Sequence, residues 1–165
     1  MEPFERLTSI CPPYLHLFVG DTKKLRRLLT LIEQGGEPHP LVKIINGAHC
    51  QTPDELFNEF AQIMEFPSYF GYNWAALDEC LNDLSWLPAN AYIIVIRDFD
   101  KVFVNLADDK KTLIDIVIKS AIAWAQGQHF GALKRKPTPF HIVLQCTQQE
   151  EEIVRLLKEA KLKEC

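Results

Sequence analysis

The sequence predicts an α/β fold, with a small and largely parallel sheet whose strands are joined by helical crossovers. Short apolar runs at 14–19, 41–45, 91–96 and 140–144 alternate with longer segments of helical periodicity. Strands that are connected through helices pair in parallel when they share a sheet. The run at 91–96 is continuously apolar and rich in isoleucine and valine, which is typical of a strand covered on both faces. We therefore expect it to be the central strand.

The first 40 residues contain a strand and a helix of their own. Asp21 follows the strand at 14–19 and is a residue type that caps helices. The next apolar residues fall at helical spacing: Leu25, Leu28, Leu29 and Ile32. We expect 1–40 to be an extension packed on the main body, 41–165. It would add an edge strand and a helix that covers part of the very apolar helix predicted at 110–126.

Capping residues mark the helices of the main body. The strand at 41–45 closes on an Asn46-Gly47 turn, and 52–55 (Thr-Pro-Asp-Glu) is a capping box with proline at the first helical position. Pro67 is expected to stop that helix. Asn73 is a plausible cap for the next one, whose apolar stripe consists of Trp74, Leu77, Leu81 and Leu84.

The last third continues the alternation. A helix at 110–126 carries an unusually wide apolar stripe, and a loop at 131–139 leads to the strand at 140–144. A second capping box at 147–150 (Thr-Gln-Gln-Glu) predicts a final helix that begins after Thr147. The order of elements is thus complete to the end of the chain.

Composition favours one soluble globular unit. The chain has 165 residues, of which 47% are hydrophobic and 24% charged, and it shows neither a membrane-spanning run nor a signal peptide. We therefore expect a cytoplasmic protein. Its five cysteines lack CxxC spacing, so we expect free and mostly buried thiols, with Cys80 in the core. No metal, cofactor or small-molecule substrate is expected.

Negative charge is concentrated in the middle of the chain. Residues 65–109 hold eight acidic and two basic side chains, a balance of −6, whereas the other residues hold 14 and 16. On the helix after Asn73, positions 78, 79 and 82 lie opposite the apolar stripe, so Asp78, Glu79 and Asn82 should be displayed. Such a face attracts a basic partner. The simpler alternative is a solvated helix face.

The segment 66–81 (FPSYFGYNWAALDECL) resembles the signature of the barstar family, inhibitors of barnase-like secreted ribonucleases. The resemblance extends over roughly 41–146, because the strands and capped helices follow that family's order. It implies a barstar-like fold with an extra N-terminal strand and helix. It also implies a function, in which the helix after Asn73 and the preceding loop enter a ribonuclease cleft and place carboxylates where RNA phosphates would bind.

Carried over to this chain, the resemblance implies a set of partner-binding residues around that helix. Glu79 stands where barstar has its dominant aspartate, Tyr69 would be an aromatic contact, and Gly71 and Asn73 would shape the loop. The full expected set is Tyr69, Gly71, Asn73, Asp78, Glu79, Asn82, Asp83 and Trp86.

Three positions depart from the family pattern. Ala75 replaces an acid, Asp78 replaces a tryptophan, and Lys119 and Ser120 stand near where further glutamates occur. Since a glutamate at 79 also reaches about one methylene further than an aspartate, we expect a basic ribonuclease or nuclease toxin other than barnase.

Other readings of the sequence remain open. The chain could be a barstar-fold interaction module that has lost nuclease inhibition, or an enzyme centred on Asp98 and Asp100 beyond the central strand. No catalytic residue is expected, because the adjacent His49 and Cys50 would seldom face each other as a nucleophile and base.

The basic cluster at 134–136 is expected to be a solvated loop, so we expect no direct nucleic-acid partner. Trp74 should lie in the core, whereas Trp86 could seal the core or contact a partner.

Overall fold

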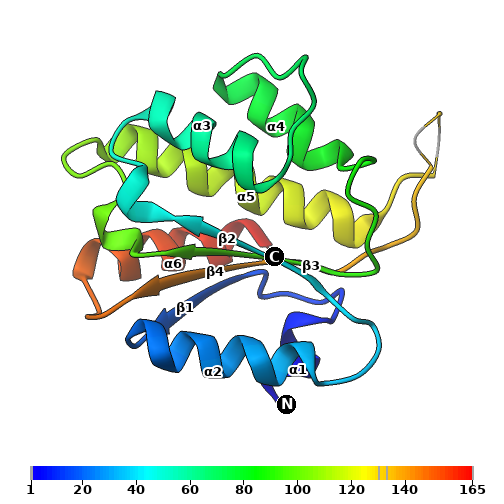
Figure 1. Cartoon of the computed structure of the whole chain (residues 1–165), viewed down its shortest axis with the longest axis horizontal. Helices are drawn as coiled ribbons and strands as arrows, with labels where there is room; N and C mark the ends of the chain where they lie inside the picture. Colours follow the sequence, from blue (N-terminus) through cyan, green and yellow to red (C-terminus); the bar gives the residue numbers. More distant parts are fainter. Residues whose placement is uncertain (1, 130, 133, 165) are drawn as a thin grey trace.

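Four parallel strands form one sheet in the computed structural model, which describes residues 2–129, 131–132 and 134–164. The strands are β1 (Leu15–Val19), β2 (Leu41–Asn46), β3 (Tyr92–Arg97) and β4 (Phe140–Cys146), in the order β1-β4-β3-β2 (Figure 1). The predicted α/β class and parallel pairing are confirmed. β3 is central as expected, and β4 shares that place.

Helices connect the strands at nearly the predicted positions. They are α1 (Pro3–Leu7), α2 (Thr22–Glu33), α3 (Pro53–Ile63), α4 (Trp74–Asp83), α5 (Ala107–Gln126) and α6 (Glu151–Glu164). Short 3-10 turns lie at Gly47–His49 and Phe99–Lys101. The short α1 was not expected. The start of α6 was placed too early, because the Glu150 carbonyl rather than that of Thr147 accepts the first helical bond, from the Val154 amide at 3.1 Å.

The two faces of the sheet carry different helices. Figure 1 shows α1 and α2 below the sheet and α3, α4 and α5 above it. Alternate residues of β3 divide between them: Ile93 and Val95 pack with α2, whereas Ile94 and Ile96 belong to the larger core under α5. Both faces of β3 are therefore covered, which explains its unbroken apolar run.

The expectation that the N-terminal helix covers α5 was wrong. Leu25, Leu29 and Ile32 of α2 pack on the opposite face of the sheet, against Ile93, Val95 and Val143. The apolar stripe of α5 is instead covered by α4, α6 and β4. Without α2, the β-branched residues on this face of the sheet would be exposed to water. Burying them makes this face the more favourable position for α2.

The N-terminal segment is attached to the sheet through two histidines. The His16 Nε2 atom on β1 lies 3.0 Å from His141 Nδ1 on β4, and His141 Nε2 lies 2.7 Å from the Ser9 carbonyl oxygen. Because that carbonyl can only accept, His141 donates from Nε2 and accepts from His16 at Nδ1. Burial lowers the pKa of both rings, that of His16 to about 3, so the pair is neutral at pH 7.

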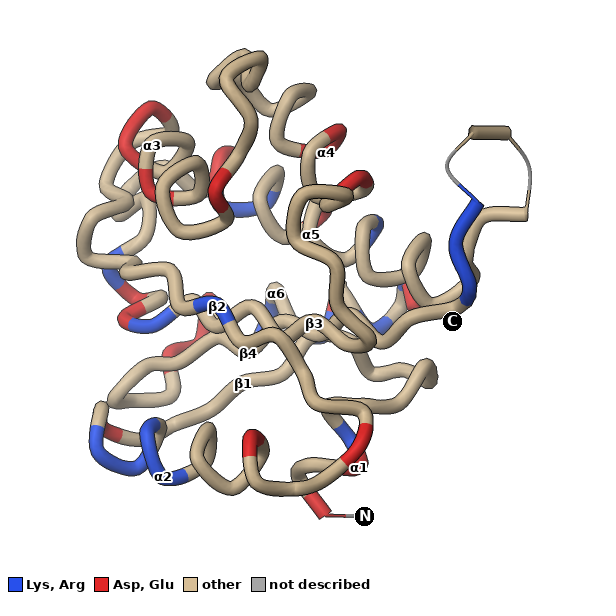
Figure 2. Tube along the Cα trace, turned by 45° about the vertical axis from the view of Figure 1, so that its right-hand side comes forward, with Lys and Arg blue, Asp and Glu red and all other residues tan. Residues whose placement is uncertain are grey.

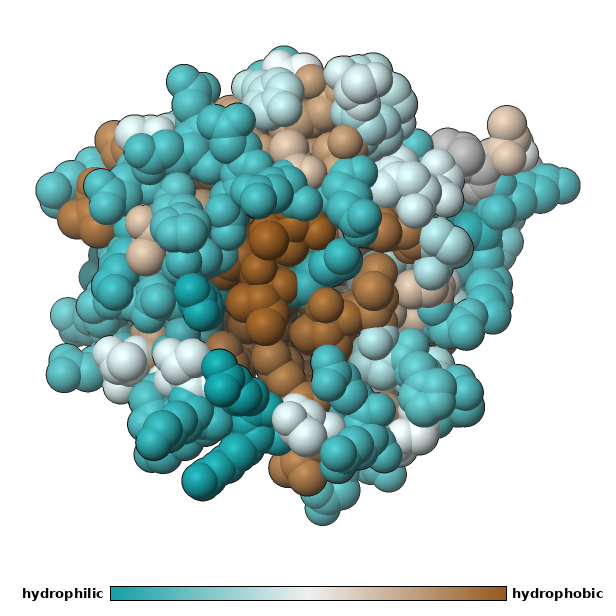
Figure 3. All heavy atoms as spheres, in the orientation of Figure 1, coloured by the Kyte–Doolittle hydropathy of each residue, from teal (hydrophilic) through white to brown (hydrophobic). Residues whose placement is uncertain are grey.

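The other edge of the sheet, at β2, is only partly covered. Figure 3 shows apolar side chains gathered in the middle of this view, within a hydrophilic surround. Ile44 of β2 is one of the exposed large apolar residues of the protein. Lys43, the preceding residue, forms an ion pair of 3.2 Å with Glu65. A charged residue in the middle of an edge strand hinders unwanted strand pairing.

Candidate functional site

The candidate site is built on α4 and on the loop before it. Asn73 caps α4 as predicted: its side chain accepts from the Ala76 amide at 2.8 Å and donates to the Gly71 carbonyl at 3.2 Å. A Cβ atom on Gly71 would lie only 3.2 Å from the Asn73 amide nitrogen, so glycine allows this close approach. Phe66 and Phe70 anchor the loop with ring centroids 4.7 Å apart. The loop is thereby held in one shape.

The inner face of α4 belongs to the core. Leu77, Cys80 and Leu81 are buried, and the Trp124 indole of α5 donates to the Leu81 carbonyl at 2.7 Å. Burial raises the pKa of the Cys80 thiol to about 11, which keeps it protonated, and its predicted place in the core is confirmed. Trp74 is half-buried and packs edge-on against Phe57 at 5.0 Å between ring centroids. α4 is therefore a rigid platform.

Glu79 is the acid of α4 that faces solvent most freely. Its side chain is exposed, and within the described part of the chain it forms no hydrogen bond or ion pair. Ala75, one turn earlier, is exposed on the same side. The placement of Glu79 on the displayed face agrees with the sequence analysis.

Asp78 and Asn82 were expected to be displayed to solvent, but both have partners within the protein. The Asp78 carboxylate forms an ion pair of 3.2 Å with Lys119 of α5, and 29% of its side chain is exposed. Asn82 donates to Asp78 Oδ1 at 3.1 Å and lies 3.2 Å from the Ser120 hydroxyl. Because α4 packs along α5, the row at 78 and 82 faces the seam between the two helices. These residues join the helices, and the Lys119 ammonium offsets the charge of Asp78.

Tyr69, Asp83 and Trp86 lie around the C-terminal end of α4. The Tyr69 hydroxyl donates to Asp83 Oδ2 at 3.4 Å, while 63% of Tyr69 remains exposed. Asp83 also accepts from the Ser85 amide at 3.2 Å. Trp86 is half-buried, and its indole donates to the Met64 carbonyl at 2.9 Å. Its polar atom is thus used within the protein, in keeping with the core-sealing alternative for this residue.

Sequence reasoning missed the role of Arg135. The guanidinium lies 3.7 Å from the ring centroid of Trp124, and Nη1 donates to the Asn82 carbonyl at the end of α4. Burial lowers the pKa of this guanidinium. The expectation of a fully solvated loop is therefore wrong for Arg135, although Lys134 and Lys136 are exposed. The sequence signal was weak, because the three basic residues are adjacent and only the fold turns one of them inward.

A shallow hollow separates this loop from α4. Its volume is about 310 Å³, and its lining includes Asp83, Ser85, Lys134 and Lys136. The backbone amides and carbonyls of Gln128 and Arg135 pair at 2.8 and 3.0 Å, which fixes the loop beside α4. The surroundings of α4 therefore present both signs of charge.

The side chains that could have supported catalysis have structural partners. His49 bonds Glu59 and Asn46, whereas the Cys50 thiol donates to the Asn46 carbonyl at 3.4 Å. Burial raises the pKa of Cys50 to about 12, so this thiol is a poor nucleophile. Among the residues that the structure describes, no group of histidine, cysteine and carboxylate side chains could hold a metal ion.

The carboxyl edge of the sheet is bridged by a buried glutamine. Gln145 accepts from the Asp98 amide at 2.8 Å and donates to the Gly20 carbonyl at 2.7 Å. Its side chain thus ties the ends of β1, β3 and β4 together at the place where open α/β sheets often bind ligands. No described helix is long and apolar enough to cross a membrane.

The parallel sheet with a capped, outward-facing helix before β3 defines a barstar-like α/β protein. Residues 41–145 match the family model Barstar (barnase inhibitor), which covers more than half of the chain. The protein therefore belongs to the barstar family, as the sequence resemblance implied. α1, β1, α2 and α6 lie outside the matched residues. No curated protein matches the chain.

Proposed function

We propose that this protein inhibits a basic ribonuclease or nuclease toxin by inserting the outer face of α4 into its active-site cleft. The observation that carries the proposal is Glu79, an exposed carboxylate without an internal partner on a rigid helix. A cleft that binds RNA is cationic, because it must hold phosphates. A fixed carboxylate can therefore take the place of a phosphate there.

Rigidity makes this carboxylate effective. The Asn73 cap and the buried inner face hold α4 before binding, so little backbone entropy is lost on association. Hydrogen bonds between a carboxylate and a guanidinium or ammonium group are the stronger kind, worth about 1.5–3 kcal/mol each. One such bond changes the dissociation constant by roughly 10- to 150-fold.

The loop before α4 supplies exposed aromatic surface. Tyr69 and Tyr72 are 63% and 51% exposed, and both precede the Asn73 cap. Tyrosines are enriched in protein interfaces because they combine apolar area with a polar atom. We place them at the rim of the contact, around Glu79.

The charge pattern argues for a partner other than barnase. Ala75 leaves one displayed position of α4 without charge, and the Lys119 ammonium offsets the charge of Asp78. The matching cleft therefore needs one dominant cation opposite Glu79 rather than several. The negative balance of −6 over 65–109 speeds the approach of such a cationic partner.

Inhibition assays with purified nucleases test the proposal. Barnase, further basic ribonucleases and any nuclease encoded beside this gene would be mixed with the protein, and residual RNA cleavage measured at low and high salt. Inhibition by the wild type that weakens roughly 10- to 150-fold in Glu79→Gln supports the proposal. Glu33→Gln, an exposed acid of α2 with the same charge change, is the matched control and should inhibit like the wild type.

Two outcomes would contradict this assignment. Unchanged cleavage with every nuclease would leave the alternative, a barstar-fold interaction module without nuclease inhibition. Equal losses in the Glu79 and Glu33 variants would place the contact away from α4.

A further inference from the structure

A second charged surface lies on α2, on the opposite side of the molecule from α4. Figure 2 shows Lys and Arg along α2 below the sheet and acidic residues on α3 and α4 above it. Four cations occur within five positions, Lys23, Lys24, Arg26 and Arg27, and all are exposed. α2 lies outside the residues that match the barstar family, so this surface belongs to the extension of this chain.

The four cations have no partner in the parts of the chain that the structure describes. None of them forms an ion pair or a side-chain hydrogen bond there. The one nearby acid, Asp21, is engaged as the N-cap and accepts from the Lys24 amide at 2.9 Å. Cations in the first half of a helix also oppose the helix dipole. A bound anion would reduce both the repulsion among these cations and their unfavourable interaction with the helix dipole.

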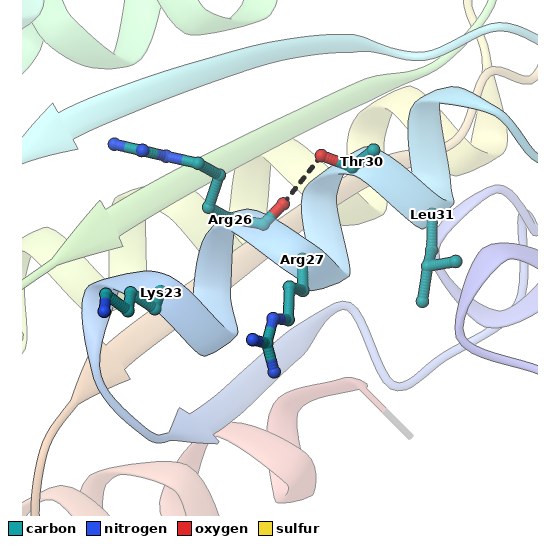
Figure 4. Close-up of a pocket in the computed structure, with 5 residues that line it drawn as sticks. All are labelled: Lys23, Arg26, Arg27, Thr30 and Leu31. Carbon is teal, nitrogen blue, oxygen red and sulfur yellow. Dashed lines mark hydrogen bonds between the residues drawn. The ribbon is translucent and has the colours of Figure 1, made fainter.

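Three of the four cations line a shallow hollow on the helix surface. Its volume is about 620 Å³, and Lys23, Arg26, Arg27, Thr30 and Leu31 line it. Figure 4 shows Arg26 and Arg27 extending to different sides of α2, so the positive charge is spread across the width of the helix. The Thr30 hydroxyl donates to the Arg26 carbonyl at 2.9 Å and is thus turned to the backbone. The surface therefore offers several separate cations rather than one enclosed site.

We propose that this surface binds the phosphate backbone of double-stranded RNA. Several cations set a turn apart match a ligand with regularly repeated negative charges, and arginine engages phosphate in two-pronged fashion. The exposed face of α2 carries no aromatic side chain on which unpaired bases could stack. This favours a duplex, which is bound mainly through its shape, phosphates and sugar hydroxyls, over a single strand.

The packing of α2 argues against a membrane as the occupant. Its apolar residues Leu25, Leu29 and Ile32 are buried against the sheet, which leaves Leu31, at 64% exposure, to face solvent. A helix that lies in a lipid interface needs a whole apolar face free for insertion. α2 and α4 are separated by the sheet, so RNA on one side and a protein on the other can bind together.

The earlier expectation that nucleic acid is not a partner rested on the cluster at 134–136. It left the larger group of four cations from Lys23 to Arg27 out of account. The RNA proposal revises that expectation and does not depend on nuclease inhibition, because it uses neither α4 nor its loop.

Fluorescence anisotropy with a labelled RNA duplex of about 16 base pairs tests the proposal. With four phosphate contacts, the binding constant should fall roughly a hundredfold between about 50 and about 200 mM salt. The double variant Arg26→Gln, Arg27→Gln should halve the slope of log K against log salt and bind more weakly throughout. The matched control, Lys134→Gln with Lys136→Gln, removes the same charge from the opposite side and should bind like the wild type.

Melting followed by circular dichroism would verify that both double variants are folded. Three results would overturn the proposal: no binding of the duplex at low salt, equal weakening in the two variants, or binding to phosphatidylserine vesicles without binding to RNA. The last result would identify a membrane as the occupant instead.

Discussion

The His16–His141 pair makes the stability of the fold depend on pH in a calculable way. Burial, the neighbouring His141 and the cations Arg6 and Lys161 lower the pKa of His16 from 6.5 to about 3. The folded state thus binds fewer protons than the unfolded state below pH 6.5. The stabilisation is fully present above that value and is lost as the pH falls toward 3.

The magnitude follows from this shift. Each pH unit between the two pKa values removes about 1.4 kcal/mol, so acidification from about pH 7.5 to about pH 5 should remove about 2 kcal/mol through His16. His141, whose pKa is also lowered by burial, acts in the same direction. Since whole domains are stable by only about 5–15 kcal/mol, such a loss is easily measured.

Urea unfolding at the two pH values is the assay. In His16→Gln, whose amide can still donate to His141, the loss of unfolding free energy on acidification should shrink by about 2 kcal/mol. The control is His39→Gln, because His39 is exposed and its ring pairs with the exposed Glu37 at 3.3 Å. This variant should lose as much unfolding free energy on acidification as the wild type. An undiminished loss in the His16 variant would refute a neutral, hydrogen-bonded pair.

Three further substitutions probe the site and its support. Lys119→Ala should change the unfolding free energy by less than about 1 kcal/mol but free the Asp78 carboxylate. Stopped-flow association with a cationic ribonuclease should then become faster at low salt. An unchanged association rate would count against α4 as the contact surface. Gly47→Ala should destabilise the protein by about 1–3 kcal/mol in thermal unfolding, since the new Cβ would lie 2.4 Å from the Arg97 carbonyl oxygen. A variant as stable as the wild type would show that the backbone of this turn can shift to make room for the methyl group. Arg135→Met should lower stability by about 1–3 kcal/mol in urea and leave Trp124 more exposed to a fluorescence quencher, whereas unaltered quenching would contradict the stacking contact.

Local signals predicted most of the fold because they act within a few residues of one another. The Asn73 side chain caps α4 through the Ala76 amide, and Thr52 caps α3 through the Glu55 amide. The unbroken apolar run of β3 predicted a strand covered on both faces. This is confirmed, because alternate residues of β3 belong to the hydrophobic clusters on opposite sides of the sheet. These features need no knowledge of distant residues, so the sequence was sufficient to place them.

The errors concern which elements meet in space. Periodicity identified the apolar stripe of α2 but could not say which face of the sheet it would cover. It likewise placed Asp78 opposite the core stripe of α4, although α5 then packs beside it and brings Lys119 to that carboxylate. Arg135 reaches Trp124 only because the loop folds back. Such contacts join residues far apart in the chain, and the helical period does not encode them.

The contacts of α4 show that its acidic residues can act on a partner in two ways, at short range through a direct bond or at long range through the electrostatic field. A count of acidic residues does not distinguish the two. Asp78 is offset by Lys119, and Asp83 accepts from Tyr69 and Ser85, which leaves Glu79 free to make a new short-range bond. The remaining acids act on a cationic partner only through the long-range field, which salt screens. On the proposed function, substitution of Glu79 should therefore mainly raise the dissociation rate, because it removes a contact made in the complex. Substitution of a distant acid such as Asp108 should instead lower the association rate at low salt and leave dissociation unchanged.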